Sequence, residues 1–166
     1  MLKNTTMYGI MLWCMKNFMR NALEEAKKAE KINEVPIGAV IVRDGEIIGK
    51  GYNLTETTGD PTMHAEIRAI RNATEKTGYS RLYGAVMYVT CEPCTMCAGA
   101  IILARIKKVV IATMDKKTGA CGSVYNLLEQ NNLNHKAEIE TGVMGEEASA
   151  MMSDFFKKLR KHKSEE

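Results

Sequence analysis

Residues 86–112, VMYVTCEPCTMCAGAIILARIKKVVIA, set the architecture that we expect for this chain. Residues 86–90 are almost all β-branched or aromatic, which predicts a strand. A helix is predicted from Pro93 to about residue 104, because proline fits the first turn, where its missing N–H breaks no helical bond. A second strand is predicted at 107–112. Strands that are joined through a helix pair in parallel, so this stretch predicts an α/β protein.

The flanking sequence adds an antiparallel pair and further helices. Asp44-Gly45 is a strong hairpin-turn signal between the β-branched runs 37–42 and 47–52. Apolar residues recur at helical spacing in 15–33, which predicts a helix there. Further helices are expected at 62–76, 124–130 and 146–162, a strand at 137–141, and loops at 53–61 and 116–123. The predicted fold is a three-layer α/β/α arrangement, with a mixed central sheet of about five strands flanked by helices.

Length and composition indicate one globular domain. The 166 residues are 45% hydrophobic and 26% charged, as is ordinary for a chain with a single filled core. We expect residues 15–162 to form this domain and 163–166 to be a polar tail. Residues 1–14 differ in composition from the rest of the chain and carry no evident chemistry. We therefore expect them to be an N-terminal extension that is not necessarily part of the fold.

Charge and cysteine content narrow the function classes. The net charge is only +3, so RNA or DNA binding would need local clusters of cations. The five cysteines are an odd number, with three within residues 91–97, which suits a metal in a reducing compartment better than a disulfide framework. The longest apolar stretch near the N-terminus, residues 8–15, is too short for a membrane helix and lacks signal-peptide features. We therefore expect a cytoplasmic protein with no membrane partner.

Two short motifs at predicted helix starts carry the chemistry: His64-Ala65-Glu66, and PCTMC at 93–97. Residues two apart point to nearly opposite sides of a helix, so His64 and Glu66 can converge only if that helix is aimed end-on at the site. Cys94 and Cys97, three residues apart, share a helix face. One imidazole and two thiolates leave the fourth position of a tetrahedral Zn²⁺ open to water, which marks a catalytic site.

Glu66 is then left over as a carboxylate beside that water, where it can move the water proton. Singly the motifs are weak, because CxxC pairs are common and a histidine on a helix is usually a core or surface residue. Together, HxE followed by PCxxC is the signature of zinc nucleobase deaminases. We therefore expect one catalytic Zn²⁺ per chain, with His64, Cys94 and Cys97 as ligands and Glu66 as the catalytic residue.

Cys91 continues the even spacing of Cys94 and Cys97, and it has two interpretations. It could be a substitute ligand or a redox partner of the other thiols. Because it precedes the helix and no proline frames it, the simpler interpretation is a small apolar residue in the pocket wall.

Several segments resemble the bacterial tRNA adenosine deaminases, over roughly residues 15–162. The zinc motifs are shared by the wider cytidine-deaminase-like superfamily, whereas GYN at 51–53 and DKKTGACGS at 115–123 narrow the resemblance to this branch. The family usually has leucine or another residue that is not cysteine at position 91, a departure that bears on pocket shape and not on the ligand set. The other matching segments are NALEEA at 21–26, PIGAVIV at 36–42, DPTMHAE at 60–66, YVTCEPCTMCAG at 88–99, NLL at 126–128, NH at 134–135 and FFKKLR at 155–160.

The resemblance implies a cytidine-deaminase-like fold and conversion of adenosine to inosine at the wobble position of a tRNA anticodon, by a homodimer. The partner would be the tRNA anticodon stem-loop, with zinc on the three predicted ligands and Glu66 as the proton shuttle. Asn53 is similar to the asparagine that hydrogen-bonds the flipped base in that family, with the Ala65 backbone beside it. Asparagine after a hairpin is also a common turn residue, so both roles stay open.

Two charged segments are candidates for substrate contact. Asp115 and Lys117 follow a strand end, where substrate contacts are expected, and solvated loop charges are the plain alternative. The basic run of the last helix suits phosphate contacts with a structured RNA. It equally suits a solvated helix end that the helix dipole favours. The members of this run are Lys157, Lys158, Arg160, Lys161 and Lys163.

Two rival functions share most of these features. A deaminase of a free base or nucleoside, such as cytosine, guanine or cytidine, would have every residue of the zinc site. A non-catalytic, zinc-containing RNA-binding subunit would keep the metal for folding. Such a subunit would have no need of the unliganded carboxylate of Glu66.

Overall fold

The computed structural model describes the backbone of residues 2–165 and the side chains of Met7 and of residues 9–162. The side chains of the predicted polar tail at 163–166 lie outside this part. The elements follow in the order α1 (Leu2–Lys31), β1 (Gly38–Arg43), β2 (Glu46–Tyr52), α2 (Thr55–Thr58), α3 (Ala65–Thr77), β3 (Val86–Cys91), α4 (Thr95–Leu103), β4 (Lys108–Thr113), β5 (Glu138–Thr141) and α5 (Gly145–Glu165).

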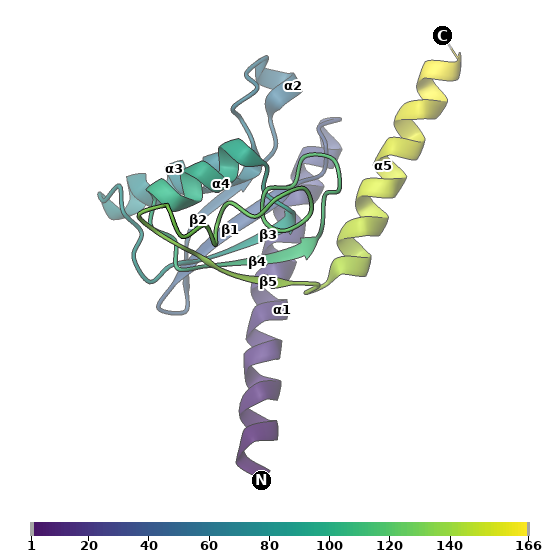
Figure 1. Cartoon of the computed structure of the whole chain (residues 1–166). Helices are drawn as coiled ribbons and strands as arrows, with labels where there is room; N and C mark the ends of the chain where they lie inside the picture. The colour runs from purple at the N-terminus through teal and green to yellow at the C-terminus, as the bar shows by residue number, and fades with distance from the viewer. Residues whose placement is uncertain (1, 166) are drawn as a thin grey trace.

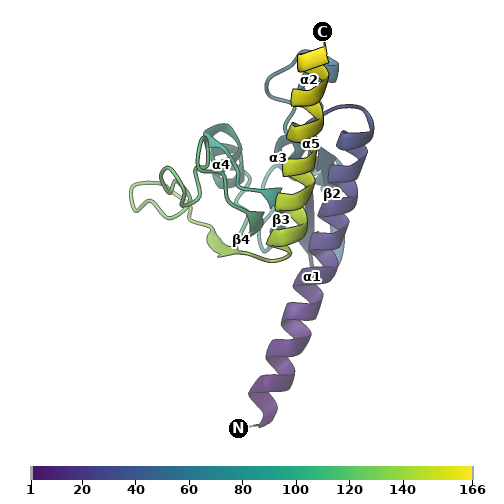
Figure 2. The same cartoon turned by 90° about the vertical axis from the view of Figure 1, so that its right-hand side faces the viewer.

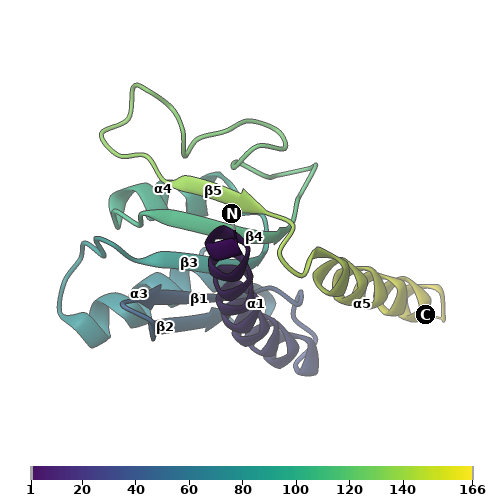
Figure 3. The ribbon, with the colours of Figure 1, turned by 90° about the horizontal axis from the view of Figure 1, so that it is seen from below.

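The strands form one mixed sheet in the order β2-β1-β3-β4-β5 (Figure 3). The hairpin turn at Asp44 and Gly45 places β2 antiparallel to β1, and β1 also runs antiparallel to β3. The neighbours β3, β4 and β5 are parallel, with Val89 opposite Ile111. The stretch 86–112 therefore forms the predicted strand–helix–strand unit, and the predicted mixed sheet of five strands is confirmed for the described residues.

Successive side chains of a strand point to opposite faces of the sheet, and apolar residues on both faces build a core on each side. Ala39 and Ile41 of β1 belong to a buried cluster with α3 and α4. Val40 and Val42 point the other way, into a second cluster that contains Met19 of α1 and part of α5. The two pairs of helices cover opposite faces of the sheet, as Figures 1 and 2 show from two directions. The predicted three-layer α/β/α arrangement is thus confirmed.

Helix α1 begins earlier than we expected, at Leu2 instead of residue 15. Its first turns extend beyond the sheet (Figure 1), and Met7, Ile10 and Trp13 are exposed there. Packing against the sheet involves Leu12 and Met15 onward. A helix that is already nucleated by tertiary packing gains one hydrogen bond for each residue it adds, which accounts for the longer helix. That residues 1–14 form an extension outside the domain stays a prediction.

The helix that we expected at 124–130 is wrong: this segment consists of bends and turns, with an isolated β-bridge between Asn126 and Cys121. The side chain of Asn126 accepts from the Glu129 N–H at 3.3 Å and donates to Glu129 Oε2 at 2.6 Å. Such local side-chain bonds offer the backbone an alternative to helical hydrogen bonds. Conversely, the short helix α2 lies within the segment 53–61, where we expected only a loop.

No helix in the described part of the chain combines the length and the hydrophobicity that crossing a bilayer requires. The five cysteines all lie in this part and all are free thiols.

Candidate active site and metal centre

Two helix starts meet where the parallel strands β3 and β4 end. His64 and Cys94 are the residues immediately before α3 and α4, and both have extended backbones, with ψ of 154° and 178°. Neither side chain makes a capping hydrogen bond, so both are free to face each other. The helices begin at residues 65 and 95, slightly later than expected, and Pro93 therefore precedes the first turn of α4. The end-on approach that the HxE spacing predicts is what the structure has.

The imidazole of His64 lies against both sulfurs of the PCxxC segment. Its Nδ1 is 3.6 Å from Cys94 Sγ and 3.5 Å from Cys97 Sγ. Among the described residues, these three donor atoms lie within 4.8 Å of one another. Zinc bonds of about 2.3 Å to sulfur and 2.0–2.1 Å to nitrogen, at a tetrahedral angle, hold the two atoms about 3.6 Å apart. The spacing and the donor set therefore fit a tetrahedral metal ion.

A hydrogen bond joins the two thiols of this site and shifts their pKa values in opposite directions. The hydrogen bond from Cys97 lowers the pKa of Cys94 to about 4, and the contact with His64 acts in the same direction. The hydrogen bond with Cys94, together with burial, raises the pKa of Cys97. Cys94 thus offers a thiolate at neutral pH, and a divalent cation that displaces the Cys97 proton would complete the pair.

Glu66 lies in the first turn of α3, beside the three donor residues but outside the group that could hold a metal. Its side chain is 3% exposed and lines the same cavity as His64 and Cys94. Burial raises the pKa of Glu66 to about 7. The structure therefore places a carboxyl group in the same cavity as the donor group, without making it part of that group.

A cavity of about 160 Å³ opens at this site. It brings together the predicted residues Asn53, Ala65, Glu66 and Asp115, which come from separate segments of the chain. Lys117 is not part of its wall. The lining consists of Val35, Ile37, Asn53, Thr55, His64, Ala65, Glu66, Cys91, Glu92, Cys94, Asp115 and Thr118.

Asn53 is buried in the cavity wall and held by Glu34, a residue that the sequence interpretation missed. Its Nδ2 donates to Glu34 Oε2 at 2.9 Å and to Thr55 Oγ1 at 3.2 Å. Burial opposes the ionisation of Glu34, but hydrogen bonds led by those from Thr57 outweigh it and lower the pKa of Glu34. A glutamate just after a helix is usually solvated, and the mixed sequence KINEVP at 31–36 gives no signal that Glu34 is buried.

Of the two loop charges at 115 and 117, the structure brings only Asp115 to the cavity. The Asp115 carboxylate accepts from the Lys117 N–H at 2.8 Å and from the Thr118 hydroxyl at 2.5 Å. Although partial burial opposes it, these bonds lower the pKa of Asp115. The Lys117 side chain is exposed to solvent. Asp115 thus serves first to shape its own loop.

Cys91 is 7% exposed and lines the cavity, but it does not belong to the group of metal donors among the described residues. Burial raises its pKa to about 12, so it remains a protonated thiol at neutral pH. These two properties favour the interpretation of Cys91 as an apolar wall residue over that of a substitute ligand.

The basic residues of α5 lie on an exposed helix that reaches the end of α1 nearest the site. Lys158 Nζ is 3.1 Å from Glu30 Oε1, close to the C-terminal end of α1. Lys157 pairs with Asp154 at 3.5 Å on the same helix, and both are solvent-exposed. Arg160 and Lys161 are also exposed. The run therefore flanks the site without entering its cavity.

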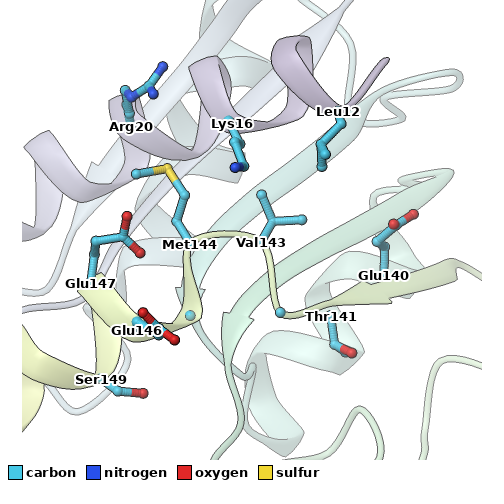
Figure 4. A pocket seen from close by; sticks show the side chains of 12 residues that line it. Leu12, Lys16, Arg20, Glu140, Thr141, Val143, Met144, Glu146, Glu147 and Ser149 are labelled. Carbon is cyan, nitrogen blue, oxygen red and sulfur yellow. The ribbon is translucent and has the colours of Figure 1, made fainter. Parts of the chain in front are cut away.

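A larger groove of about 780 Å³ lies between α1 and the start of α5 (Figure 4). Its lining contains Lys16 and Arg20 on one side and Glu146 and Glu147 on the other. It contains no histidine or cysteine, so it lacks the donors that a zinc site of this kind requires. The His-Cys-Cys donor group found among the described residues lies at the smaller cavity instead.

The fold and the site together define a class. A mixed five-stranded sheet covered by helices, with HxE and PCxxC at two converging helix starts, is the arrangement of the zinc nucleobase deaminases. The chain is a hydrolytic deaminase of the cytidine-deaminase-like fold.

Comparisons with known proteins narrow this class. The family model of MafB19-like deaminases matches residues 15–160. A tRNA-specific adenosine deaminase of Bacillus subtilis (strain 168) is 50% identical over 88% of this chain and 91% of the relative. The chain belongs to the family of tRNA-specific adenosine deaminases.

Solved structures agree with this assignment. A structure from studies of A-to-I editing by tRNA:A34 deaminases at the wobble position of transfer RNA has a TM-score of 0.78 and 44% identity, over 81% of this chain and 98% of that one. A guanine deaminase of Bacillus subtilis has a TM-score of 0.56 and 43% identity, over 59% of this chain and 63% of that one. The tRNA deaminase thus matches a larger part of the fold.

Proposed function

We propose that this chain converts adenosine to inosine at the wobble position of a tRNA anticodon, as a zinc-dependent hydrolase. The observation that carries the proposal is the buried, unliganded Glu66 beside a His-Cys-Cys donor group at the end of a small cavity. The family to which the chain belongs supplies the substrate class. Deaminases take their target base out of the stack, and a cavity of about 160 Å³ suits one flipped base.

His64, Cys94 and Cys97 would hold one zinc ion per chain. Zinc, when bound, supplies Lewis acidity that lowers the pKa of water toward about 7. The thiolate character of Cys94 and the Nδ1···Sγ distances of 3.5 and 3.6 Å support this donor set. The helix starts that carry these residues add a favourable positive end near the thiolates.

Glu66 would carry the proton through the reaction. Its carboxylate would take a proton from the attacking water and pass it to the purine ring nitrogen next to C6. It would then take the second proton from the hydroxyl group now on C6 and deliver it to the leaving amine as the C6–N bond breaks, so that adenosine and water give inosine and ammonia. One carboxylate serves both transfers, because after the first transfer it has returned to its basic form.

Asn53 and the Ala65 backbone would hold the base in place. Asn53 is suited to this role because Glu34 fixes its amide within the cavity wall. Asp115, in the loop 115–123, would complete the wall of this cavity. Lys117 would contact the RNA outside the cavity, since its side chain is exposed and its neighbour Thr118 lines the cavity.

The anticodon stem-loop would be bound through its phosphates by α5. We assign this role to Lys157, Lys158, Arg160 and Lys161, which are exposed on the helix that reaches the site end of α1. We further propose that the enzyme acts as a homodimer in the cytoplasm, where its tRNA substrate would be found. Light scattering of the purified protein would give its oligomeric state.

The proposal is tested by incubating the zinc-loaded protein with an anticodon stem-loop that carries adenosine at the wobble position. Inosine in the digested RNA, with an equal amount of ammonia, is the expected result. Matched reactions contain free adenosine, cytidine, cytosine or guanine. Ammonia from a free base or nucleoside but not from the RNA would contradict the proposal in favour of a small-molecule deaminase. No turnover in any reaction would favour a non-catalytic zinc subunit.

A further inference from the structure

Glu92 is a buried carboxylate to which the proposed mechanism gives no part. It is 4% exposed and lies two residues before Cys94. Its Oε1 accepts hydrogen bonds from the backbone N–H groups of Cys121 and Ser123, at 2.9 and 3.0 Å. Its Oε2 accepts from the Asp115 N–H at 2.9 Å and from the Ser123 hydroxyl. Four donors of one loop, residues 115–123, thus converge on a single side chain.

The rest of this loop is also tied to the segment of the PCxxC motif. The Ala120 N–H donates to the Pro93 carbonyl at 2.9 Å, and Gly119 forms an isolated β-bridge with Cys94. Gly119 has no room for a side chain, because a Cβ there would overlap the Glu92 carboxylate and the Asp115 carbonyl. The loop is therefore folded tightly around Glu92.

We propose that Glu92 is a positioning residue, which fixes the loop 115–123 relative to the metal-ligand segment and so sets the shape of the substrate cavity. The loop supplies Asp115 and Thr118 to the cavity wall, which also contains Asn53. Both Glu92 oxygens are committed to loop donors, so Glu92 acts through the loop and neither holds metal nor carries the reaction's protons. The kinetic part of this inference rests on the proposed function.

The substitution Glu92→Gln removes the charge and one of the two hydrogen-bond acceptors of this side chain but keeps its size. A glutamine amide has one acceptor and one donor end. Whichever way it turns, its NH₂ group faces at least one backbone N–H, either that of Asp115 or those of Cys121 and Ser123. A buried N–H that loses its acceptor weakens the loop, while the side-chain volume stays nearly the same.

The experiment compares zinc-loaded wild type, Glu92→Gln and a control, Glu140→Gln, which removes the ion pair with Lys108 on β4 and β5, away from the cavity. We expect Glu92→Gln to keep one zinc per chain. Amide hydrogen exchange in 115–123 should rise about tenfold or more. KM for the anticodon stem-loop should rise about tenfold, whereas kcat changes about threefold at most. The control should match wild type in all four measurements.

Unchanged exchange and unchanged KM in Glu92→Gln would overturn the inference, as would zinc loss without faster exchange in the loop. Should this variant fail to fold, Gly119→Ala and Ser123→Ala provide the same test. Both are expected to raise loop exchange and KM, with the smaller effect in Ser123→Ala, and wild-type values in both would overturn the inference. Wild type that is inactive on RNA would refute the proposed function instead, and loop exchange, which needs no substrate, would still decide the role of Glu92.

Discussion

The side-chain amide of Asn53 is oriented by the carboxylate of Glu34. Asn53 Nδ2 donates to Glu34 Oε2 at 2.9 Å, and Glu34 is fully buried. A carboxylate only accepts hydrogen bonds, so it determines which end of the amide is the nitrogen. The second N–H of this nitrogen points to the Thr55 hydroxyl at 3.2 Å, which also lines the cavity. The orientation of the amide that we propose to hold the base thus depends on a residue outside the cavity.

Glu34→Gln should therefore impair base recognition although the residue never touches the substrate. A glutamine can accept or donate, so the Asn53 amide loses its fixed orientation. We expect kcat/KM for the stem-loop to fall about tenfold or more, as for a lost hydrogen bond to a charged group. The same fall should follow from Asn53→Ala, and the double variant should be no worse than the poorer single one. Effects that multiply in the double variant would show that the two residues act independently.

Glu66→Ala should separate metal binding from catalysis. Because Glu66 is not among the donor residues, the variant should keep one zinc per chain and a wild-type circular dichroism spectrum. Its kcat should fall by about 10²–10⁴-fold, the range for loss of general acid–base catalysis. Zinc content and inosine formation are measured on the same sample. Turnover close to that of wild type would refute the proton-shuttle assignment.

Cys94→Ser should lose the metal, whereas Cys91→Ala should keep it. Cys94 supplies one of three donor atoms, and because metal binding is coupled to folding, its loss should also lower Tm. Cys91 lies in the cavity wall outside the donor group, so removing its sulfur should leave the zinc stoichiometry unchanged. Metal analysis after dialysis distinguishes the two variants. Zinc loss in Cys91→Ala would return Cys91 to the ligand set.

The double variant Lys157→Gln/Arg160→Gln should weaken RNA binding in a salt-dependent way. Each lost phosphate contact should lower the slope of log Kd against log salt by about 1. Lys76→Gln is the matched control, because Lys76 is an exposed cation at the far end of α3, bound to the Ile47 carbonyl. Fluorescence anisotropy of a labelled stem-loop at several salt concentrations gives the slopes. An unchanged slope in the double variant would identify the basic run as a solvated helix end.

The convergence of the His-Cys-Cys donor group and the sheet could be predicted from the sequence for a physical reason. Zinc accepts few residue types, and the helix geometry restricts the spacing at which His64, Cys94 and Cys97 can converge. Likewise, β-branched runs and the turn at Asp44-Gly45 are local signals. These runs, the turn and each of the two motifs depend on residues that lie close together in the chain, and the donor requirement of zinc relates the two motifs across the 30 residues between His64 and Cys94.

The two buried carboxylates could not be predicted in the same way. Glu34 and Asn53 are 19 residues apart, and Glu92 and Cys121 are 29 apart, so no short-range pattern relates them. The segment 124–130 does not form the predicted helix for a local reason. The side chain of Asn126 makes hydrogen bonds there that helix propensity alone does not include. What the sequence interpretation missed was therefore the layer of residues that orients the site.

Zinc X-ray absorption spectroscopy of the loaded protein tests the proposed metal centre most directly. We predict two sulfur neighbours at about 2.3 Å, one imidazole nitrogen at about 2.0–2.1 Å and one further light atom from solvent. A third sulfur in the first shell, or a shell without sulfur, would contradict this arrangement and with it the role assigned to Glu66.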